Sequence, residues 1–232
     1  MDTFCDRLHH LQAHIAETAI RYGRAPEEIR LLAVSKTHPV ERVREAIDCG
    51  QRAFGENYVQ EMAEKARALA DLEVEWHFIG PIQSNKTRLI AELSGWVHSV
   101  DREKIARRLS EQRPAGAPPI QTCLQVNVSG EESKSGADPA DLPALAQAVA
   151  GLPGLELRGL MAIPAATDDA ALQRQAFARV RELMEDLQRR GHRLDTLSMG
   201  MSNDLEAAIA EGATIVRVGT ALFGARQKPT GK

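Results

Sequence analysis

Hydrophobic and polar positions along this chain first repeat with a helical period and then alternate between two kinds of segment. The apolar residues Phe4, Leu8, Leu11, Ile15 and Ala19 recur every three or four positions, which predicts an amphipathic helix near the N-terminus. From residue 30 onward, short apolar runs alternate with longer stretches of helical period. The short runs predict strands over residues 30–36, 52–57, 75–80, 95–100, 120–130, 155–163, 195–200 and 214–219.

The regular alternation of these eight strands with helices is typical of a parallel sheet. Eight strands can close a (β/α)8 barrel, a fold whose usual size is about 250 residues. Because the chain has 232 residues, we expect a single α/β domain over residues 1–232: a TIM barrel with an extra N-terminal helix. A doubly wound open sheet is the alternative. That fold normally has fewer strands, and no G-x-G-x-x-G motif follows the first strand here.

Composition and charge argue against several classes of partner and site. With 29 basic and 32 acidic residues the net charge is -3, so we expect no nucleic-acid partner. The N-terminal "MDTFCDRLHH" lacks the apolar core of a signal peptide, and no apolar run is long enough to cross a membrane. Cys5, Cys49 and Cys123 have neither a disulfide framework nor a metal-ligand spacing. We therefore expect a cytoplasmic protein with three free thiols and no metal site.

Polar residues stand at most of the expected strand ends. The first strand ends on Lys36, although lysine is almost never buried without a partner. Active sites of (β/α)8 barrels lie at the C-terminal ends of the strands. The residues found there are Lys36, Asn57, His77, His98, Ser99, Asn127, Met161, Pro164, Ser198 and Arg217. Single members of this set also have structural explanations, since His77 and His98 could be buried structural histidines and Asn57 could cap a helix.

Two segments near the C-terminus predict a phosphate site. In "SMGMSND", Gly200 gives backbone freedom and either Ser202 or Asn203 could cap the next helix, with Asn203 and Glu206 at capping-box spacing. In "RVGTALFG", Gly219 and Thr220 follow the eighth strand. Loops after strands seven and eight form a recurring phosphate site in this fold. The alternative is a pair of glycine turns with a cap.

A lysine, an anion site and an arginine at the same barrel end suit one kind of ligand. An amine such as that of Lys36 can form a Schiff base with an aldehyde. A phosphorylated aldehyde would be held in the phosphate site while it condenses with the lysine. Pyridoxal 5′-phosphate (PLP) is such a molecule, and Arg217 would then face its pyridine nitrogen.

The segment "SGEESKSG", residues 129–136, is rich in serine and glycine around Lys134. Its order differs from that of a P-loop. A mobile loop and a flap over the barrel mouth, with Lys134 as an added cation, remain equal alternatives.

Long segments of the chain resemble the YggS/PROSC family of PLP-binding, or PLP-homeostasis, proteins. The resemblance covers nearly the whole chain. It is carried by "AVSKTHP", "FGENYVQE", "WHFIGPIQSNK", "VNVSGEESKSG", "GLMAIP" and "SMGMSNDLEAAIAEGATIVRVGTALFGAR". It implies a barrel similar to the N-terminal domain of alanine racemase, with PLP on the lysine of "VSK", here Lys36.

The resemblance also assigns roles around the expected cofactor. The racemase phosphate turn implies Arg217 at the pyridine nitrogen and Gly219, Thr220 and Ser202 at the phosphate. Asn57 and Ser198 complete the expected cofactor-binding set. The family usually has an acid where this chain has Asn203, so we expect a less negative phosphate surround and not a lost site.

Three functions of different class remain open. The resemblance implies a PLP carrier or regulator without turnover of its own, with a role in PLP supply and amino-acid balance. We expect a monomer that holds PLP reversibly and releases it to PLP-dependent apo-enzymes. The alternatives are a PLP-dependent amino-acid racemase and a Schiff-base aldolase without PLP. The chain has two tyrosines, Tyr22 and Tyr58, and only Tyr58 is near enough to a strand end to serve as a second base. Arg217 opposite the ring nitrogen would favour the unprotonated ring, a weak electron sink. We therefore expect no catalytic residues.

Overall fold

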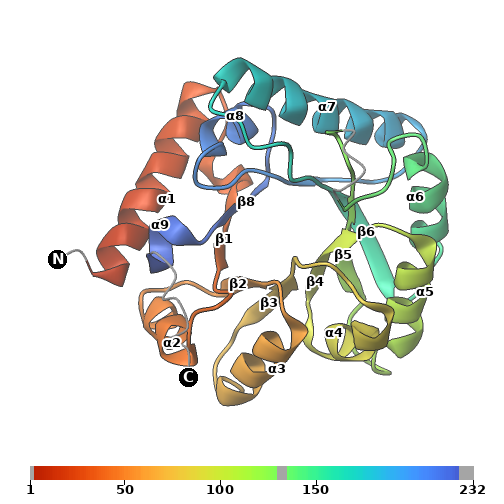
Figure 1. Ribbon diagram of the computed structural model, residues 1–232, viewed down its shortest axis with the longest axis horizontal. Helices are drawn as coiled ribbons and strands as arrows, with labels where there is room; N and C mark the ends of the chain where they lie inside the picture. The colour runs from red at the N-terminus through yellow and green to blue at the C-terminus, as the bar shows by residue number, and fades with distance from the viewer. Residues whose placement is uncertain (1–2, 130–134, 225–232) are drawn as a thin grey trace.

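The eight strands form one closed, all-parallel barrel in which each strand pairs with its neighbours in chain order (Figure 1). A computed structural model describes residues 3–129 and 135–224. Its strands are β1 (Arg30–Val34), β2 (Ala53–Glu56), β3 (Glu75–Phe78), β4 (Trp96–Val100), β5 (Ile120–Gln125), β6 (Leu155–Met161), β7 (Thr196–Ser198) and β8 (Ile215–Val218). Pairing of Leu32 with Arg217 and of Ala33 with Val218 closes the barrel. The (β/α)8 prediction is confirmed, and the open sheet is excluded.

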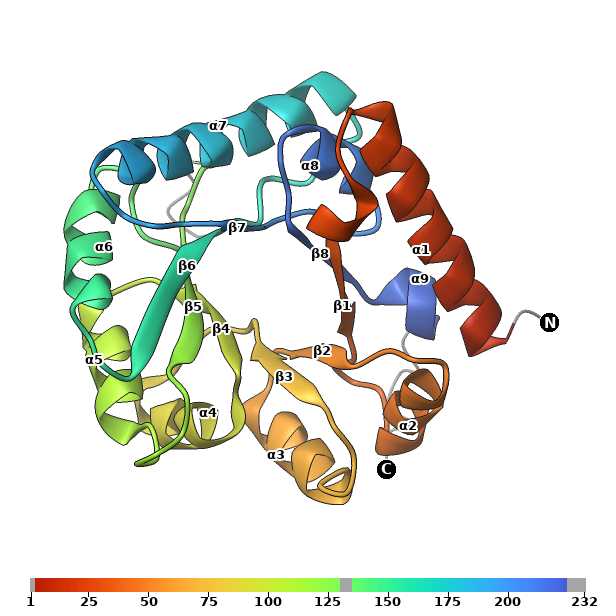
Figure 2. The ribbon, with the colours of Figure 1, turned by 180° about the vertical axis from the view of Figure 1, so that it is seen from behind.

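Helices surround the barrel on its outside, as Figure 2 shows from behind. They are α1 (Phe4–Arg21), α2 (Val40–Asp48), α3 (Val59–Ala68), α4 (Thr87–Leu93), α5 (Glu103–Gln112), α6 (Leu142–Ala150), α7 (Ala170–Arg189), α8 (Leu205–Ala210) and α9 (Thr220–Phe223). Two 3₁₀ turns, η1 (Pro26–Glu28) and η2 (Ser84–Lys86), precede β1 and α4. Most strands end before their predicted ends, because the chain leaves the ladder there to form the loops of the C-terminal face.

The extra N-terminal helix completes the outer ring. Helix α9 has only 4 residues, and α1 lies beside it and beside α8 (Figure 1). The rings of Phe4 and Phe223 lie 5.2 Å apart, and Arg7 Nε donates to Leu222 O at 2.7 Å. Helix α1 therefore covers the region that a longer eighth helix would cover, and it holds α9 in place.

The hydrophobic core has two layers. One lies between the strands and the helices. The smaller one fills the barrel interior and consists of Leu32, Val34, Ala53, Ile79, Trp96, Cys123, Met161 and Ile215. Side chains alternate between the two sides of a strand. Because Leu32 and Val34 point inward, this alternation also directs Lys36 inward, at the C-terminal end of the barrel.

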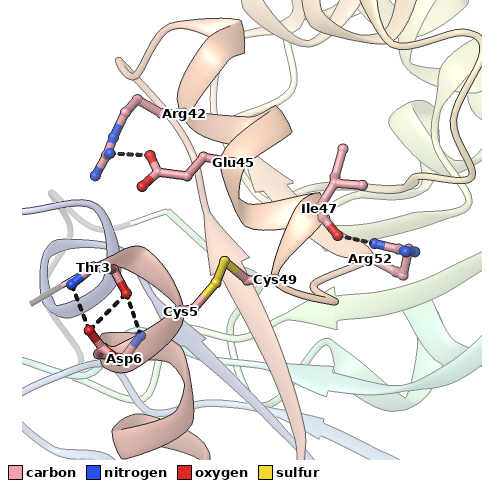
Figure 3. The surroundings of a disulfide bond; sticks show 8 residues. All are labelled: Thr3, Cys5, Asp6, Arg42, Glu45, Ile47, Cys49 and Arg52. Carbon is pink, nitrogen blue, oxygen red and sulfur yellow. Dashed lines mark hydrogen bonds and ion pairs between the residues drawn. A yellow bond between two sulfur atoms is a disulfide. The ribbon is translucent and has the colours of Figure 1, made fainter.

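A disulfide joins Cys5 of α1 to Cys49 at the C-terminal end of α2 (Figure 3). The prediction of three free thiols is therefore wrong for this pair. The two cysteines are 44 residues apart, but α1 packs against α2 and brings their Cα atoms to 5.2 Å, a distance that a disulfide spans. Cys123 is a free, fully buried thiol, and burial raises its pKa to about 12.

Within the part of the chain that the structure describes, no helix is both long and apolar enough to cross a membrane. The same residues contain no group of three or more His, Cys, Asp or Glu side chains placed to hold a metal ion.

Candidate functional site

A cavity of about 640 Å³ opens at the C-terminal ends of the strands. Its volume lies in the range of small-molecule binding sites. Six of the seven predicted site residues line it: Lys36, Asn57, Ser202, Arg217, Gly219 and Thr220. The seventh, Ser198, is fully buried and contacts Arg217 from behind. The loop after β6 also lines the cavity through residues 163–168, of which the sequence analysis had named only Pro164 as a strand-end residue.

Both residues next to Lys36 are fixed by carboxylates from neighbouring elements. Ser35 Oγ donates to Glu56 Oε1 at 2.6 Å. The backbone N–H of Thr37 donates to Glu61 Oε2 at 2.8 Å. Thr37 has a φ of 64°, and it is the one non-glycine residue with a positive φ in the described segments. Strained backbone of this kind persists only where the surroundings hold it, so Lys36 leaves β1 at a position that is rigidly defined on both sides.

The two carboxylates are joined by a buried lysine that the sequence analysis missed. Lys65 of α3 donates to Glu56 Oε1 at 2.6 Å and to Ser35 O at 2.8 Å. Its Nζ also lies 3.4 Å from Glu61 Oε2. The side chains of Lys65 and Glu56 are 6% and 0% exposed. Burial raises the pKa of Glu56, while Lys65 opposes that shift. The buried ion pair therefore anchors the chain immediately before Lys36.

Asn57 lines the cavity from the end of β2 and has an unsatisfied acceptor. Its Oδ1 is buried and has no hydrogen-bond partner, which is uncommon for a buried polar atom. The backbone at Asn57 is packed against Gly80, where an added Cβ would lie 2.1 Å from Asn57 O. Only glycine permits this approach. Asn57 thus presents an acceptor that a bound donor could satisfy.

The predicted phosphate residues gather at one side of the cavity. Gly219 and Thr220 form the start of α9 directly after β8, and Ser202 comes from the turn after β7. Gly200 has a φ of 93° in that turn, a conformation that favours glycine. Helix α8 begins later than predicted, because Asp204 and not Asn203 is its N-cap residue. Asp204 instead accepts from Met201 N at 2.6 Å, so the expected Asn203–Glu206 capping box does not form.

Arg217 points into the barrel from β8 and is 4% exposed. Its Nη1 donates to Ser198 Oγ at 2.8 Å and to Ser198 O, and its Nη2 donates to Ala162 O at 3.0 Å. Burial lowers the pKa of Arg217 to about 10. The guanidinium therefore keeps its charge at neutral pH in the wall of the cavity.

His77 and His98 lie below the cavity, inside the barrel, and do not line it. Both are fully buried. Their rings are hydrogen-bonded to each other through Nδ1 of His77 and Nε2 of His98 at 2.9 Å. Burial lowers the pKa of both histidines, and Glu75 opposes that shift at His77. The pair is neutral at physiological pH.

We expect the free energy of unfolding to fall as the pH drops below 6.5, the ordinary histidine pKa. The unfolded chain then binds protons at both histidines while the native protein does not, and each contributes up to about 1.4 kcal/mol per pH unit. Urea unfolding from about pH 8 to about pH 5 measures this slope. A His77→Gln/His98→Gln variant should show a shallower slope. An equal slope in the two proteins would contradict the assignment.

Residues 130–134 of the segment "SGEESKSG", including Lys134, lie outside the described residues. The two interpretations of the segment stay predictions.

Comparison with known proteins identifies the family. The sequence matches the family described as alanine racemase, N-terminal domain, over residues 7–227. A pyridoxal phosphate homeostasis protein of Pseudomonas aeruginosa is 65% identical over 226 residues, which cover 97% of each chain. The protein of the same name from Escherichia coli K12 is 53% identical over 229 residues, covering 97% of this chain and 98% of that one.

Solved structures show the same architecture. The PipY protein of Synechococcus elongatus, solved with PLP bound, superposes with a TM-score of 0.81 at 43% identity and covers 90% of this chain and 100% of its own. Alanine racemase from Corynebacterium glutamicum gives a TM-score of 0.72 at 16% identity, over 98% of this chain and 64% of that one, a similarity of fold. With a family model that spans almost the whole sequence and close relatives matched over nearly their full length, the chain belongs to the pyridoxal phosphate homeostasis protein family, built on the N-terminal domain of alanine racemase.

Proposed function

We propose that this protein binds PLP in the cavity at the C-terminal face, holds it through Lys36, and serves PLP homeostasis. When bound, PLP supplies an aldehyde that condenses with a primary amine: a C=N bond forms to the amine nitrogen, and the aldehyde oxygen leaves as water. The observation that carries the proposal is the gathering of an amine, a buried guanidinium and the start of α9 around one cavity. The PLP-bound PipY relative supports it.

The residues present suit this ligand. Lys36 supplies the amine, and the hydroxyls of Ser202 and Thr220 with the backbone at Gly219 would hold the phosphate. Arg217 would face the ring nitrogen. The unsatisfied Oδ1 of Asn57 would accept a hydrogen bond from a polar group of the ligand. The contacts of Ser198 place it behind Arg217, so its proposed role is to orient that guanidinium.

Removing the two phosphate hydroxyls should weaken PLP retention without unfolding the protein. Ser202 and Thr220 are exposed at the cavity rim, so a Ser202→Ala/Thr220→Val variant leaves the core intact. Hydrogen bonds to a charged group contribute about 1.5–3 kcal/mol each, and we expect the Kd for PLP to rise about tenfold or more. Equilibrium dialysis measures the Kd, and thermal unfolding of the apo variant is the control. An unchanged Kd would mean that the phosphate binds elsewhere.

The racemase-like alternative would need a second base at the cavity, and neither tyrosine supplies it there. Tyr58 is 55% exposed, and Tyr22 donates its hydroxyl hydrogen to Glu206 Oε1 at 3.0 Å. Neither tyrosine lines the cavity. Arg217 keeps its protons and cannot accept one from a substrate.

We therefore expect the PLP-loaded protein to leave the Cα hydrogen of amino acids in place. Incubation with alanine and other amino acids in deuterated water, followed by mass spectrometry, measures the exchange. Free PLP at the same concentration is the control. Rapid exchange that is lost in Lys36→Ala would overturn the non-catalytic proposal.

Release of PLP to apo-enzymes by a monomeric protein completes the proposal. Two observations support a role in PLP supply. The cavity opens at the barrel face, and the bacterial relatives are named pyridoxal phosphate homeostasis proteins. The test mixes the PLP-loaded protein with a PLP-dependent apo-enzyme, with and without a scavenger of free PLP, and measures activation of the apo-enzyme. Activation that the scavenger abolishes would argue against direct transfer.

A further inference from the structure

A continuous line of buried hydrogen bonds crosses the barrel interior beneath the cavity. It starts at Arg217, whose Nη1 donates to Ser198 Oγ at 2.8 Å. Ser198 Oγ lies 2.7 Å from Nδ1 of His98, and Nε2 of His98 lies 2.9 Å from Nδ1 of His77. Nε2 of His77 lies 2.7 Å from Oε1 of Glu75. Four elements, β8, β7, β4 and β3, each contribute to this line.

The line connects the two ends of the barrel. Arg217 lines the cavity at the C-terminal face, whereas Glu75 lines a second cavity, of about 540 Å³, at the N-terminal ends of the strands. Glu75 is held there by Arg30 of β1, whose Nη1 and Nη2 donate to its two oxygens at 2.9 and 2.7 Å. Three polar side chains between the ends, Ser198, His98 and His77, are 0% exposed.

When both rings are neutral, the chemistry of the end groups fixes the direction of every hydrogen bond. An arginine can only donate, and an ionised carboxylate can only accept. Glu75 is ionised, since hydrogen bonds from His77 and Arg30 outweigh its burial and lower its pKa to about 2. His77 must therefore donate through Nε2–H and accept at Nδ1. His98 must then donate through Nε2–H, accept at Nδ1, and receive the Ser198 hydroxyl hydrogen.

The competing arrangement places a proton on both nitrogens of one histidine. Nδ1–H of His98 would then point at Ser198 Oγ, which already accepts from Arg217. The added positive charge would lie between Arg217 and Arg30 in a buried site, where charge is strongly disfavoured. Burial and the nearby cations lower the pKa of His98 well below its usual range. The neutral, one-directional arrangement is the one that satisfies every group.

We infer that Ser198, His98, His77 and Glu75 form a one-directional hydrogen-bond relay that positions Arg217 at the ligand cavity and couples it to the Arg30–Glu75 ion pair at the opposite face. The relay leaves the Ser198 lone pairs facing Arg217 and the negative charge of Glu75 at its far end. These four are positioning residues, because they act on the ligand through Arg217. The inference deepens the proposed PLP site and rests on it for its effect on PLP, although the relay itself needs no ligand.

Histidine NMR of the apo protein tests the relay without PLP. Long-range ¹H–¹⁵N spectra distinguish the protonated nitrogen of each ring, and His77→Gln and His98→Gln assign the two signals. At neutral pH we expect both rings neutral with the proton on Nε2. In Ser198→Ala, Nδ1 of His98 should shift toward the value of a nitrogen without a donor. A doubly protonated ring, or a proton on Nδ1 of either histidine, would overturn the relay.

Binding measurements then test the coupling. Loss of a hydrogen bond to the charged Arg217 in Ser198→Ala should raise the Kd for PLP about tenfold or more, and Glu75→Gln should shift the visible absorbance maximum of the bound PLP. Glu73→Gln changes an exposed neighbour and is the matched control, which should change neither the Kd for PLP nor the absorbance maximum. Glu75→Gln with the spectrum and Kd of the wild type would overturn the coupling. If wild-type protein failed to bind PLP while the tautomers were as expected, the proposed function would fail and the relay would stand.

Discussion

We expect Lys36→Ala to remove covalent attachment of PLP and the visible absorbance that comes with it. Lys36 lies two residues after the C-terminal end of β1, in the cavity wall, and alanine has no amine to bond the aldehyde. Residues at the C-terminal face of a barrel serve function more than stability, so the variant should fold normally. Absorbance spectra after incubation with PLP and gel filtration measure the result.

The matched control is Lys104→Ala, which removes an exposed lysine from α5. It should bind PLP as the wild type does. A Lys36→Ala protein that keeps the wild-type visible spectrum would show that another lysine holds the cofactor.

Lys65→Met should lower the free energy of unfolding by about 3–5 kcal/mol, the usual cost of removing one partner of a buried ion pair. The substitution leaves the fully buried Glu56 without its cation and Ser35 O without a donor. It also releases the anchor before Lys36, so PLP attachment should weaken. Urea denaturation of the apo protein measures the stability change.

Lys104→Met is the control for this change, and it should stay within about 0.5 kcal/mol of the wild type. The Glu56→Gln/Lys65→Met double variant should lose less stability than Lys65→Met alone, because no unpaired charge remains. Equal stability of Lys65→Met and Lys104→Met would refute the structural role of the ion pair.

Much of the site could be predicted from the alternation of side chains along strands. Leu32 and Val34 point into the barrel, and the same period carries Lys36 to the cavity. The period also places Ser198 and Arg217 inward. It could not show that Ser198 lies beneath Arg217, because their depth depends on the stagger between β7 and β8.

The buried ion pair has a signature in the sequence. Lys65 lies on the same helical face as Val59 and Met62, which are buried, and Glu56 is the last residue of a fully buried, otherwise uncharged strand. A lone charge on an apolar face predicts a buried partner, since unpaired charges are rarely buried. Glu56 and Lys65 are two such charges of opposite sign, nine positions apart, and each is therefore a candidate partner for the other.

Contacts between segments that are distant in the sequence could not be predicted from any local sequence pattern. Cys5 and Cys49 meet because α1 closes the ring next to α2, and cysteine spacing carries no information about that packing. His77 and His98 could be placed inside the barrel, but their contact depends on the register between β3 and β4. Tertiary geometry, and not periodicity, determines both pairs.

Attachment of PLP to Lys36 is the central claim, and borohydride trapping tests it most directly. The wild-type protein is incubated with PLP, reduced, and digested, and the labelled peptide is identified by mass spectrometry. We predict a single label on the peptide that contains Lys36. A label mainly on another lysine, such as Lys65, Lys86 or Lys134, or a protein that carries no label, would contradict the account.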